Sequence, residues 1–386
     1  MKKKLHFIFY SELYRHGGGI ETWASYFFPK LSIKIQGYDE IIIYSLKSKN
    51  EKETLVGELL EYNNVKIVYL NIGDVVSQNT FLNYYRFLKE VKKALKANVV
   101  KQDIIISIGL LNSGFLLLNN YFIKNNKFIT WIRSKSVGEV STYKGKIYVY
   151  FAKILEKLSI KKSDYIITNG DDTLHYYQEL FPKDKSKMSR IFNAIDLDTI
   201  PPCEQNREFN ISQVRIAYTG RLSIAKGFTD YIEVSRKIAT QNNNVIFNVY
   251  GDDTKLNKNT LEHINFKGKY QPNDVNKILS ENDVVIFLNR ESQAGGVSHS
   301  LLEAMANGKL IIAWDNYTHN QVLNSSNSIL VNEGDLKGLE RVLQNLLNGF
   351  YDVQQLCQNV CNDVKLYSVN QHIKAFDNIL KQLERE

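Results

Sequence analysis

The chain has 386 residues, of which 44% are hydrophobic, and its 49 basic and 41 acidic residues give a formal net charge of +8. This length exceeds what one hydrophobic core usually fills, so we expect two domains, and the composition excludes a disordered chain. The positive charge favours an anionic partner such as a nucleotide, a phospholipid surface or a nucleic acid.

The N-terminal segment and the cysteines indicate the compartment. Three lysines precede an apolar run that meets Glu12 and Arg15 before it reaches signal-peptide length, so we interpret it as a buried strand. No stretch approaches the roughly 20 apolar residues of a membrane span. Three cysteines are too few for a disulfide framework, and Cys357 and Cys361 are interpreted as helix packing rather than a metal site. These features predict a cytoplasmic protein, with peripheral contact to the inner face of a membrane left open.

Short apolar runs alternate with longer segments of helical period, which is typical of parallel sheets covered by helices on both faces. The first series of predicted strands covers residues 5–10, 40–45, 65–70, 103–108, 128–132 and 165–169. The second series covers residues 214–219, 245–250, 264–267, 284–288, 310–314 and 328–331. Two such series predict an α/β protein with two Rossmann-like domains facing each other across a cleft.

The domain boundary is expected between residues 192 and 209, where strand and helix signals fade and PPCEQNREF has the composition of a linker. An amphipathic helix at residues 371–383 comes late enough to cross back onto the first domain. We predict a first domain of residues 1–195 plus 368–386 and a second of residues 196–367.

The segment TGRLSIAKGF, at residues 219–228, places Arg221 and Lys226 between a strand and a helix. Ligands of open α/β sheets bind at the carboxyl ends of the strands, where a helix N-terminus adds N–H donors for phosphate. Arg221 can form bidentate hydrogen bonds with two phosphate oxygens, and Lys226 supplies a flexible point charge. The alternative interpretation is two solvated surface cations.

Two further segments have small residues that permit close approach to an anion. Gly295 and Gly296 precede an apolar helix that carries Glu303, which can accept hydrogen bonds from vicinal hydroxyls such as those of a ribose; the alternative is an exposed glutamate. Residues 17–19 are three glycines after the first strand. They permit a tight turn against a diphosphate but do not match G-x-G-x-x-G, which argues against NAD.

These motifs together resemble the family-4 retaining glycosyltransferases of GT-B fold, which include many bacterial surface-polysaccharide enzymes. The similarity covers nearly the whole chain, through GGGIETW, FNAIDLD, GRLSIAKG, VYGDD, FKGKY, LLEAMANG and LKGLERVL in order. It implies an acceptor-side first domain and a second domain that binds a nucleotide-sugar donor. The alternatives are a phosphorylase or epimerase on the same frame and a non-catalytic homologue that binds donor or a partner enzyme.

The resemblance assigns roles by position. Arg221 and Lys226 would hold the donor diphosphate and Glu303 the ribose hydroxyls. The remaining donor-binding positions are Gly18, Gly19, Gly251, Lys267, Gly296, Val297 and Ser298. Because the two cations neutralise the leaving group, the resemblance implies a metal-independent enzyme with no cofactor, and retention without a strong enzymic nucleophile.

Two departures from the family pattern concern the reaction centre. The first glutamate of the family's E-x7-E pair falls on Gly295, which favours the non-catalytic alternative. Glu291 could reach the same space if residues 292–294 loop out, or it could be a surface residue beside Arg290.

A histidine that many relatives carry after the strand at residues 128–132 is Arg133 here. An arginine cannot act as a base at ordinary pH, but it can stabilise a departing phosphate or grip an anionic acceptor. The other histidines expected near the cleft are His16 and His299, and a lone histidine is usually structural.

Two basic helices of the first domain, at residues 83–96 and 144–162, combine apolar and aromatic positions at helical spacing with many lysines. They could rest on anionic lipid, at about 1 kcal/mol per cation, which would favour a lipid-linked saccharide acceptor. The alternative is that each packs on the core with a solvated lysine face. Nucleic-acid binding is not expected, because the basic residues do not gather with aromatic ones into a groove pattern.

Overall fold

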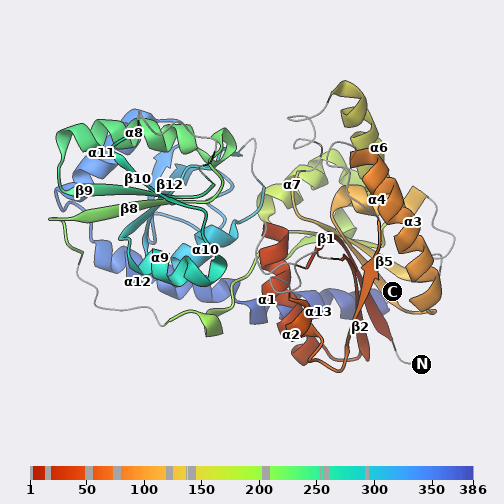
Figure 1. The fold of residues 1–386 in the computed structure, drawn as a ribbon. Helices are drawn as coiled ribbons and strands as arrows, with labels where there is room; N and C mark the ends of the chain where they lie inside the picture. Colours follow the sequence, from red (N-terminus) through yellow and green to blue (C-terminus); the bar gives the residue numbers. More distant parts are fainter. Residues whose placement is uncertain are drawn as a thin grey trace. The chain divides into compact units, whose positions relative to one another are not determined.

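The computed structural model describes residues 3–13, 19–47, 55–72, 80–118, 125–135, 137, 145–201, 209–252, 254, 261–291 and 295–385. The chain forms two compact units. Unit 1 is Met1–Asn193 with Val369–Glu386, and unit 2 is Ala194–Ser368. Each unit is a parallel sheet with helices on both faces (Figure 1).

Unit 1 contains a seven-stranded parallel sheet in the order β3-β2-β1-β4-β5-β6-β7. The strands are β1 (Lys4–Glu12), β2 (Glu40–Leu46), β3 (Val65–Leu70), β4 (Ile104–Ile108), β5 (Lys127–Ile132), β6 (Tyr165–Thr168) and β7 (Met188–Arg190). All six predicted strands are confirmed, and β7 was missed because three residues are too few to show a period. The strand order reverses between β1 and β4, and such a switch point opens a crevice at the carboxyl edge.

The helices of unit 1 cover both faces of its sheet. They are α1 (Gly19–Lys34), α2 (Val56–Leu59), α3 (Thr80–Asn98), α4 (Leu110–Leu118), α6 (Lys146–Lys162), α7 (Asp171–Leu180) and α13 (Val369–Arg385). The predicted C-terminal helix is confirmed as α13, which packs on α1 within unit 1. His372 of α13 is buried: its Nε2 accepts from Trp23 Nε1 at 3.0 Å, and its Nδ1 donates to the Phe192 carbonyl at 2.6 Å. Burial lowers the pKa of His372 to about 3, so this structural histidine is neutral.

Unit 2 contains a six-stranded parallel sheet in the order β10-β9-β8-β11-β12-β13. The strands are β8 (Val214–Thr219), β9 (Val245–Tyr250), β10 (Ile264–Gly268), β11 (Val284–Phe287), β12 (Leu310–Asp315) and β13 (Ile329–Asn332). All six match the predicted second series. The helices are α8 (Phe228–Gln241), α9 (Val275–Ser280), α10 (His299–Ala306), α11 (Leu336–Leu347) and α12 (Val353–Asp363). Figure 1 shows α8 and α11 on one face of this sheet and α9, α10 and α12 on the other.

The cysteines and the helix lengths bear on the expected compartment. Cys357 is a free thiol, but Cys361 is disulfide-bonded, so the expectation of ordinary helix packing for both was wrong for Cys361. No helix in the described parts of the chain is long and apolar enough to cross a membrane.

Candidate functional site

The loop after β8 brings the two predicted phosphate-binding cations together. Arg221 follows Gly220, and Lys226 ends the short 3-10 helix η4 (Ile224–Lys226). The buried hydroxyl of Tyr218 bonds to the carbonyl oxygens of both residues, at 2.8 Å for Arg221 and 3.2 Å for Lys226. Tyr218 therefore holds the two ends of the loop at one point. Sequence reasoning missed Tyr218, because a tyrosine in a buried strand looks like ordinary core.

The charge of Lys226 depends on its surroundings. Burial, and secondarily the positive charge of Arg221, lower the pKa of Lys226 to about 8. An ammonium group that is desolvated beside a second cation is well prepared to receive an anion, which would relieve both penalties. The buried His319 adds no charge here, because burial lowers its pKa to about 4.

We expect the pH profile of kcat/KM to have a basic limb, on which kcat/KM falls at high pH because Lys226 loses its charge. Lys226 is charged below about pH 8 and neutral above it, so kcat/KM for an anionic donor should fall as the pH rises through about 8. Lys226→Arg keeps the charge and should move this limb upward by more than one pH unit. The profile of free-enzyme kcat/KM checks this, and an unchanged limb in Lys226→Arg would contradict it. Folding stability should rise over the same range, because the unfolded chain keeps that proton up to its ordinary pKa near 10.5.

Three glycines expose the backbone at the carboxyl edge of neighbouring strands. Gly220, Gly251 and Gly268 stand at the ends of β8, β9 and β10. The Gly251 N–H donates to the Gly268 carbonyl at 3.0 Å, and a Cβ on Gly251 would lie 2.3 Å from the Gly220 carbonyl oxygen. A side chain does not fit at Gly251, where the Leu222 side chain also packs, whereas Gly220 and Gly268 have open space where a Cβ would be. Gly251, a predicted donor-binding residue, lies in this row.

The start of α10 lies at the same edge. Ser298 caps the helix by accepting from the Leu301 N–H at 3.3 Å, and Gly296 has a φ of +71°, a left-handed conformation that favours glycine. Val297 is buried, and His299 is buried as the first residue of the helix. The backbone of residues 296–298 thus enters α10 in a shape that leaves helix N–H donors at the sheet edge.

Glu303 is 9% exposed, so the alternative of a solvated glutamate on a helix face was wrong. After burial, the charge of the Glu303 carboxylate raises the pKa of Tyr270. The pKa of Tyr218 is raised mainly by burial, lowered by the charge of Arg221, and raised to a smaller extent by Tyr270. Tyr270 is therefore close enough to both Glu303 and Tyr218 to interact with them electrostatically. Sequence reasoning missed Tyr270, although it stands two residues after the glycine that ends β10.

Glu291 lies near the loop after β12. Its Oε2 accepts from the Tyr317 N–H at 2.9 Å, and its own N–H donates to Glu333 Oε2 at 3.0 Å. The Asn316 side chain also donates to Glu333, at 2.7 Å. One carboxylate oxygen of Glu291 thus holds a loop, and a contact with a transferred sugar remains a prediction.

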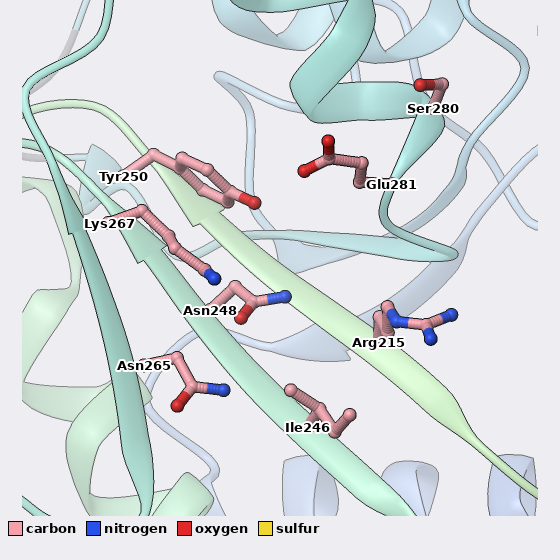
Figure 2. A pocket seen from close by; sticks show the side chains of 8 residues that line it. All are labelled: Arg215, Ile246, Asn248, Tyr250, Asn265, Lys267, Ser280 and Glu281. Atoms are coloured by element: carbon pink, nitrogen blue, oxygen red, sulfur yellow. The ribbon is translucent and has the colours of Figure 1, made fainter.

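Lys267 lines a groove of about 430 Å³ on the α9 face of the sheet (Figure 2). The lining residues are Arg215, Ile246, Asn248, Tyr250, Asn265, Lys267, Ser280 and Glu281. Among the predicted site residues, only Lys267 contributes to this lining. Its role in donor binding remains a prediction.

Arg133 of unit 1 is a charged residue that is almost fully buried. It follows β5, is 9% exposed, and lies over the Trp23 ring with its guanidinium carbon 4.7 Å from the centroid. Its Nη2 donates to Asn193 Oδ1 at 2.6 Å, whereas Nε and Nη1 are buried without a hydrogen-bond partner among the described residues. Burial lowers the pKa of Arg133 to about 9, opposed by the charge of Glu21. Two unmet buried donors cost about 1–3 kcal/mol each, so this group is suited to receive an anion.

The other predicted residues of unit 1 are less informative. Gly19 is the exposed first residue of α1. His16, Gly17 and Gly18 lie outside the described residues. The structure therefore places most predicted donor-binding residues along one edge of unit 2 and Arg133 at the corresponding edge of the unit 1 sheet.

Two doubly wound parallel sheets in one chain, with the last helix returning to the first unit, define the GT-B architecture. Residues 213–349 match the family model described as "Glycosyl transferases group 1". An uncharacterized glycosyltransferase of Methanocaldococcus jannaschii is 24% identical over an alignment of 402 positions, which covers 99% of this chain and 100% of the relative.

Solved structures share the fold at low sequence identity. Sucrose-phosphate synthase from Thermosynechococcus elongatus has a TM-score of 0.76 at 14% identity, over 100% of both chains. The HepE protein of Anabaena, solved in complex with UDP-glucose, has a TM-score of 0.70 at 13% identity and is covered over 100% of its chain by 99% of this one. These structures show that the chain has the GT-B fold, and the family model matches a segment of unit 2.

Proposed function

We propose that the protein is a metal-independent, retaining glycosyltransferase of family 4 that takes a sugar from a nucleotide-diphosphate donor. The observation that carries this proposal is the pair of cations, Arg221 and Lys226, in the loop that the Tyr218 hydroxyl closes after β8, together with the buried Glu303 of α10. Of the related folds, HepE binds UDP-glucose, which is a donor of this class. The proposed acceptor is a saccharide or lipid-linked saccharide in bacterial surface-polysaccharide synthesis.

In the proposed reaction the donor diphosphate lies against Arg221, Lys226 and the backbone of residues 296–298. Glu303 accepts hydrogen bonds from the ribose hydroxyls. As the bond between the sugar and the diphosphate breaks, its electron pair leaves with the diphosphate, where the two cations stabilise it. The acceptor hydroxyl then bonds to the anomeric carbon from the same face and passes its proton to an oxygen of the departing diphosphate, so neither a metal nor an enzymic nucleophile is required.

A second candidate is a homologue that binds donor without turnover. It is favoured by Gly295 at the place of the family's first glutamate and by the engagement of Glu291 with the Tyr317 N–H. A phosphorylase or an epimerase on the same frame is a third candidate.

A panel of UDP-, GDP-, CDP- and ADP-sugars tests the proposal, with release of the nucleoside diphosphate measured with and without saccharide acceptors. Turnover of one donor in the presence of EDTA, with the product anomer assigned by NMR, is the expected result. Binding of a donor without turnover under every acceptor condition would replace the proposal with the non-catalytic homologue. Loss of turnover in EDTA, restored by a divalent cation, would overturn metal independence, and inversion at the anomeric carbon would overturn retention.

Arg133 is proposed to bind an anionic group of the acceptor through Nε and Nη1. Arg133→Gln removes a charged hydrogen-bond donor worth about 1.5–3 kcal/mol, so kcat/KM for an anionic acceptor should fall about 10- to 100-fold. Donor hydrolysis without acceptor should be unchanged in this variant, and a neutral acceptor is the matched control. Loss of donor hydrolysis to the same extent would instead assign Arg133 to the departing phosphate.

A lipid-linked acceptor would place the reaction at the cytoplasmic face of a membrane. The positive net charge of +8 is compatible with such a surface. Localisation and acceptor class are thus parts of one proposal.

A further inference from the structure

One helix of unit 1 presents an apolar stripe to solvent. Residues Ile147, Tyr150, Phe151 and Ile154 of α6 are 65%, 63%, 54% and 41% exposed. Their spacing of three, one and three residues places them on a single face of the helix. A continuous stripe of this kind differs from the scattered exposed apolar residues that any surface carries.

The opposite face of α6 attaches the helix to unit 1. Leu155, Ser159 and Ile160 are buried, and the Ser159 hydroxyl donates to the Leu110 carbonyl of α4 at 2.6 Å. α4 approaches so closely that a Cβ on Gly114 would lie 2.4 Å from the Leu155 carbonyl oxygen. The exposed stripe is therefore not needed to hold the helix in place.

Positive charge borders the stripe along one side. Lys146, Lys153 and Lys157 are exposed and lie on neighbouring helix positions. The sole acidic residue in the α6 sequence, Glu156, is buried, so the exposed face of the helix carries no negative charge of its own. An apolar stripe with aromatic residues beside a row of lysines is the pattern of a helix that lies in a membrane interface.

The other basic helix, α3, has a different environment. Its apolar face, formed by Phe87, Leu88, Val91 and Leu95, is buried in the core of unit 1. Its lysines therefore form the solvated face of an ordinary core-facing helix, which was the alternative interpretation of this segment. The structure separates two helices that look alike in sequence.

We propose that the first half of α6 binds an anionic lipid bilayer, with Ile147, Tyr150, Phe151 and Ile154 in the interface and the lysines at the headgroups. Figure 1 shows this end of α6 extending outward from the sheet of unit 1. A second copy of the chain is a poorer occupant, because a symmetric contact would bring two lysine rows together. The proposal rests on α6 alone and does not depend on the transferase assignment.

Flotation of the full chain with phosphatidylcholine vesicles, with and without phosphatidylglycerol, tests the proposal. Binding is expected only to the anionic vesicles and should weaken at high salt. Lys153→Gln/Lys157→Gln should lower the partition coefficient about 30-fold, since each cation contributes about 1 kcal/mol near such a surface. Tyr150→Ser/Phe151→Ser should abolish binding even at low salt.

The matched control is Lys89→Gln/Lys93→Gln, which removes two exposed lysines from α3 and should leave vesicle binding unchanged. Nucleotide binding, measured by thermal shift with UDP, GDP, CDP and ADP, should be the same in all of these variants. Absence of wild-type binding to anionic vesicles, or equal losses in the α3 and α6 variants, would overturn the proposal. A dimer in light scattering that Tyr150→Ser/Phe151→Ser dissociates would assign the stripe to a second copy instead.

A fluorescent probe measures insertion directly. In a Cys357→Ser background, an environment-sensitive dye on Phe151→Cys should shift to the blue when anionic vesicles are added. The same dye on Tyr85→Cys, an α3 position that is 61% exposed, should not shift. Equal spectra for the two positions would show that α6 does not enter the interface.

Discussion

Arg221→Ala and Lys226→Ala are each expected to lower kcat/KM for the nucleotide-sugar donor by about 10²- to 10³-fold, the range found when one group that stabilises developing charge is removed. Both residues lie in the loop that Tyr218 closes, and a departing diphosphate bound there needs its charge balanced. Neither cation forms an ion pair with a described carboxylate in unit 2, so the fold should not depend on them.

Initial rates with the donor identified by the panel measure the loss, and urea unfolding measures stability. We expect both variants to remain folded, with Lys226→Ala at least as stable as the wild type at neutral pH, because it removes an ammonium group that burial and Arg221 disfavour. Lys237→Ala is the matched control, because Lys237 is a cation on α8 whose ion pair with Glu233, at 3.3 Å, lies on the surface. Near-normal turnover in Arg221→Ala or Lys226→Ala, or an equal loss in the control, would show that the loop does not hold the diphosphate.

Gly227→Ala is expected to destabilise the protein by about 3 kcal/mol. Gly227 has a φ of +69°, and an added Cβ would lie 2.2 Å from the Leu288 carbonyl oxygen. The left-handed conformation costs about 1–2 kcal/mol for alanine, and overpacking adds about 1–3 kcal/mol. The obstacle is the backbone at the end of β11, which cannot rotate away as a side chain would.

Urea unfolding with a nucleotide titration separates the two effects of this variant. Because Gly227 joins η4 to α8, any shift that relieves the clash moves Lys226, so nucleotide affinity should fall at temperatures where the variant is still folded. Gly349→Ala is the control: its φ is +75°, but no heavy atom lies within 4 Å of the added Cβ, so only the conformational cost remains. Equal stability losses at the two glycines would rule out the close contact at Leu288 as the cause.

Local sequence patterns predicted most of the secondary structure of both sheets. Twelve predicted strands and the helix α13 are present, because buried parallel strands read as apolar runs whose period is local to a few residues. The motif with Arg221 and Lys226 was also recognisable, since a glycine turn after a strand imposes its own sequence requirements. The short strand β7 was not predicted, because it is a strand through its pairing with β6 and its three residues have no distinctive composition.

Contacts between segments distant in sequence determined the other site residues and the environments of the two basic helices. Tyr218 and Tyr270 could not be assigned to the site from sequence, because the hydrogen bond from the Tyr218 hydroxyl to the Arg221 carbonyl and the proximity of Tyr270 to Glu303 arise only in the folded chain. The same holds for Arg133, whose Nε and Nη1 have no hydrogen-bond partner among the described residues and become costly only when β5 and Trp23 enclose them. The two basic helices have similar sequence patterns, and only tertiary packing decided that α3 buries its apolar face while α6 leaves one exposed. The sequence by itself thus determined the two sheets and the cation motif, since these follow from local periodicity, whereas burial and charge at each site required the assembled fold.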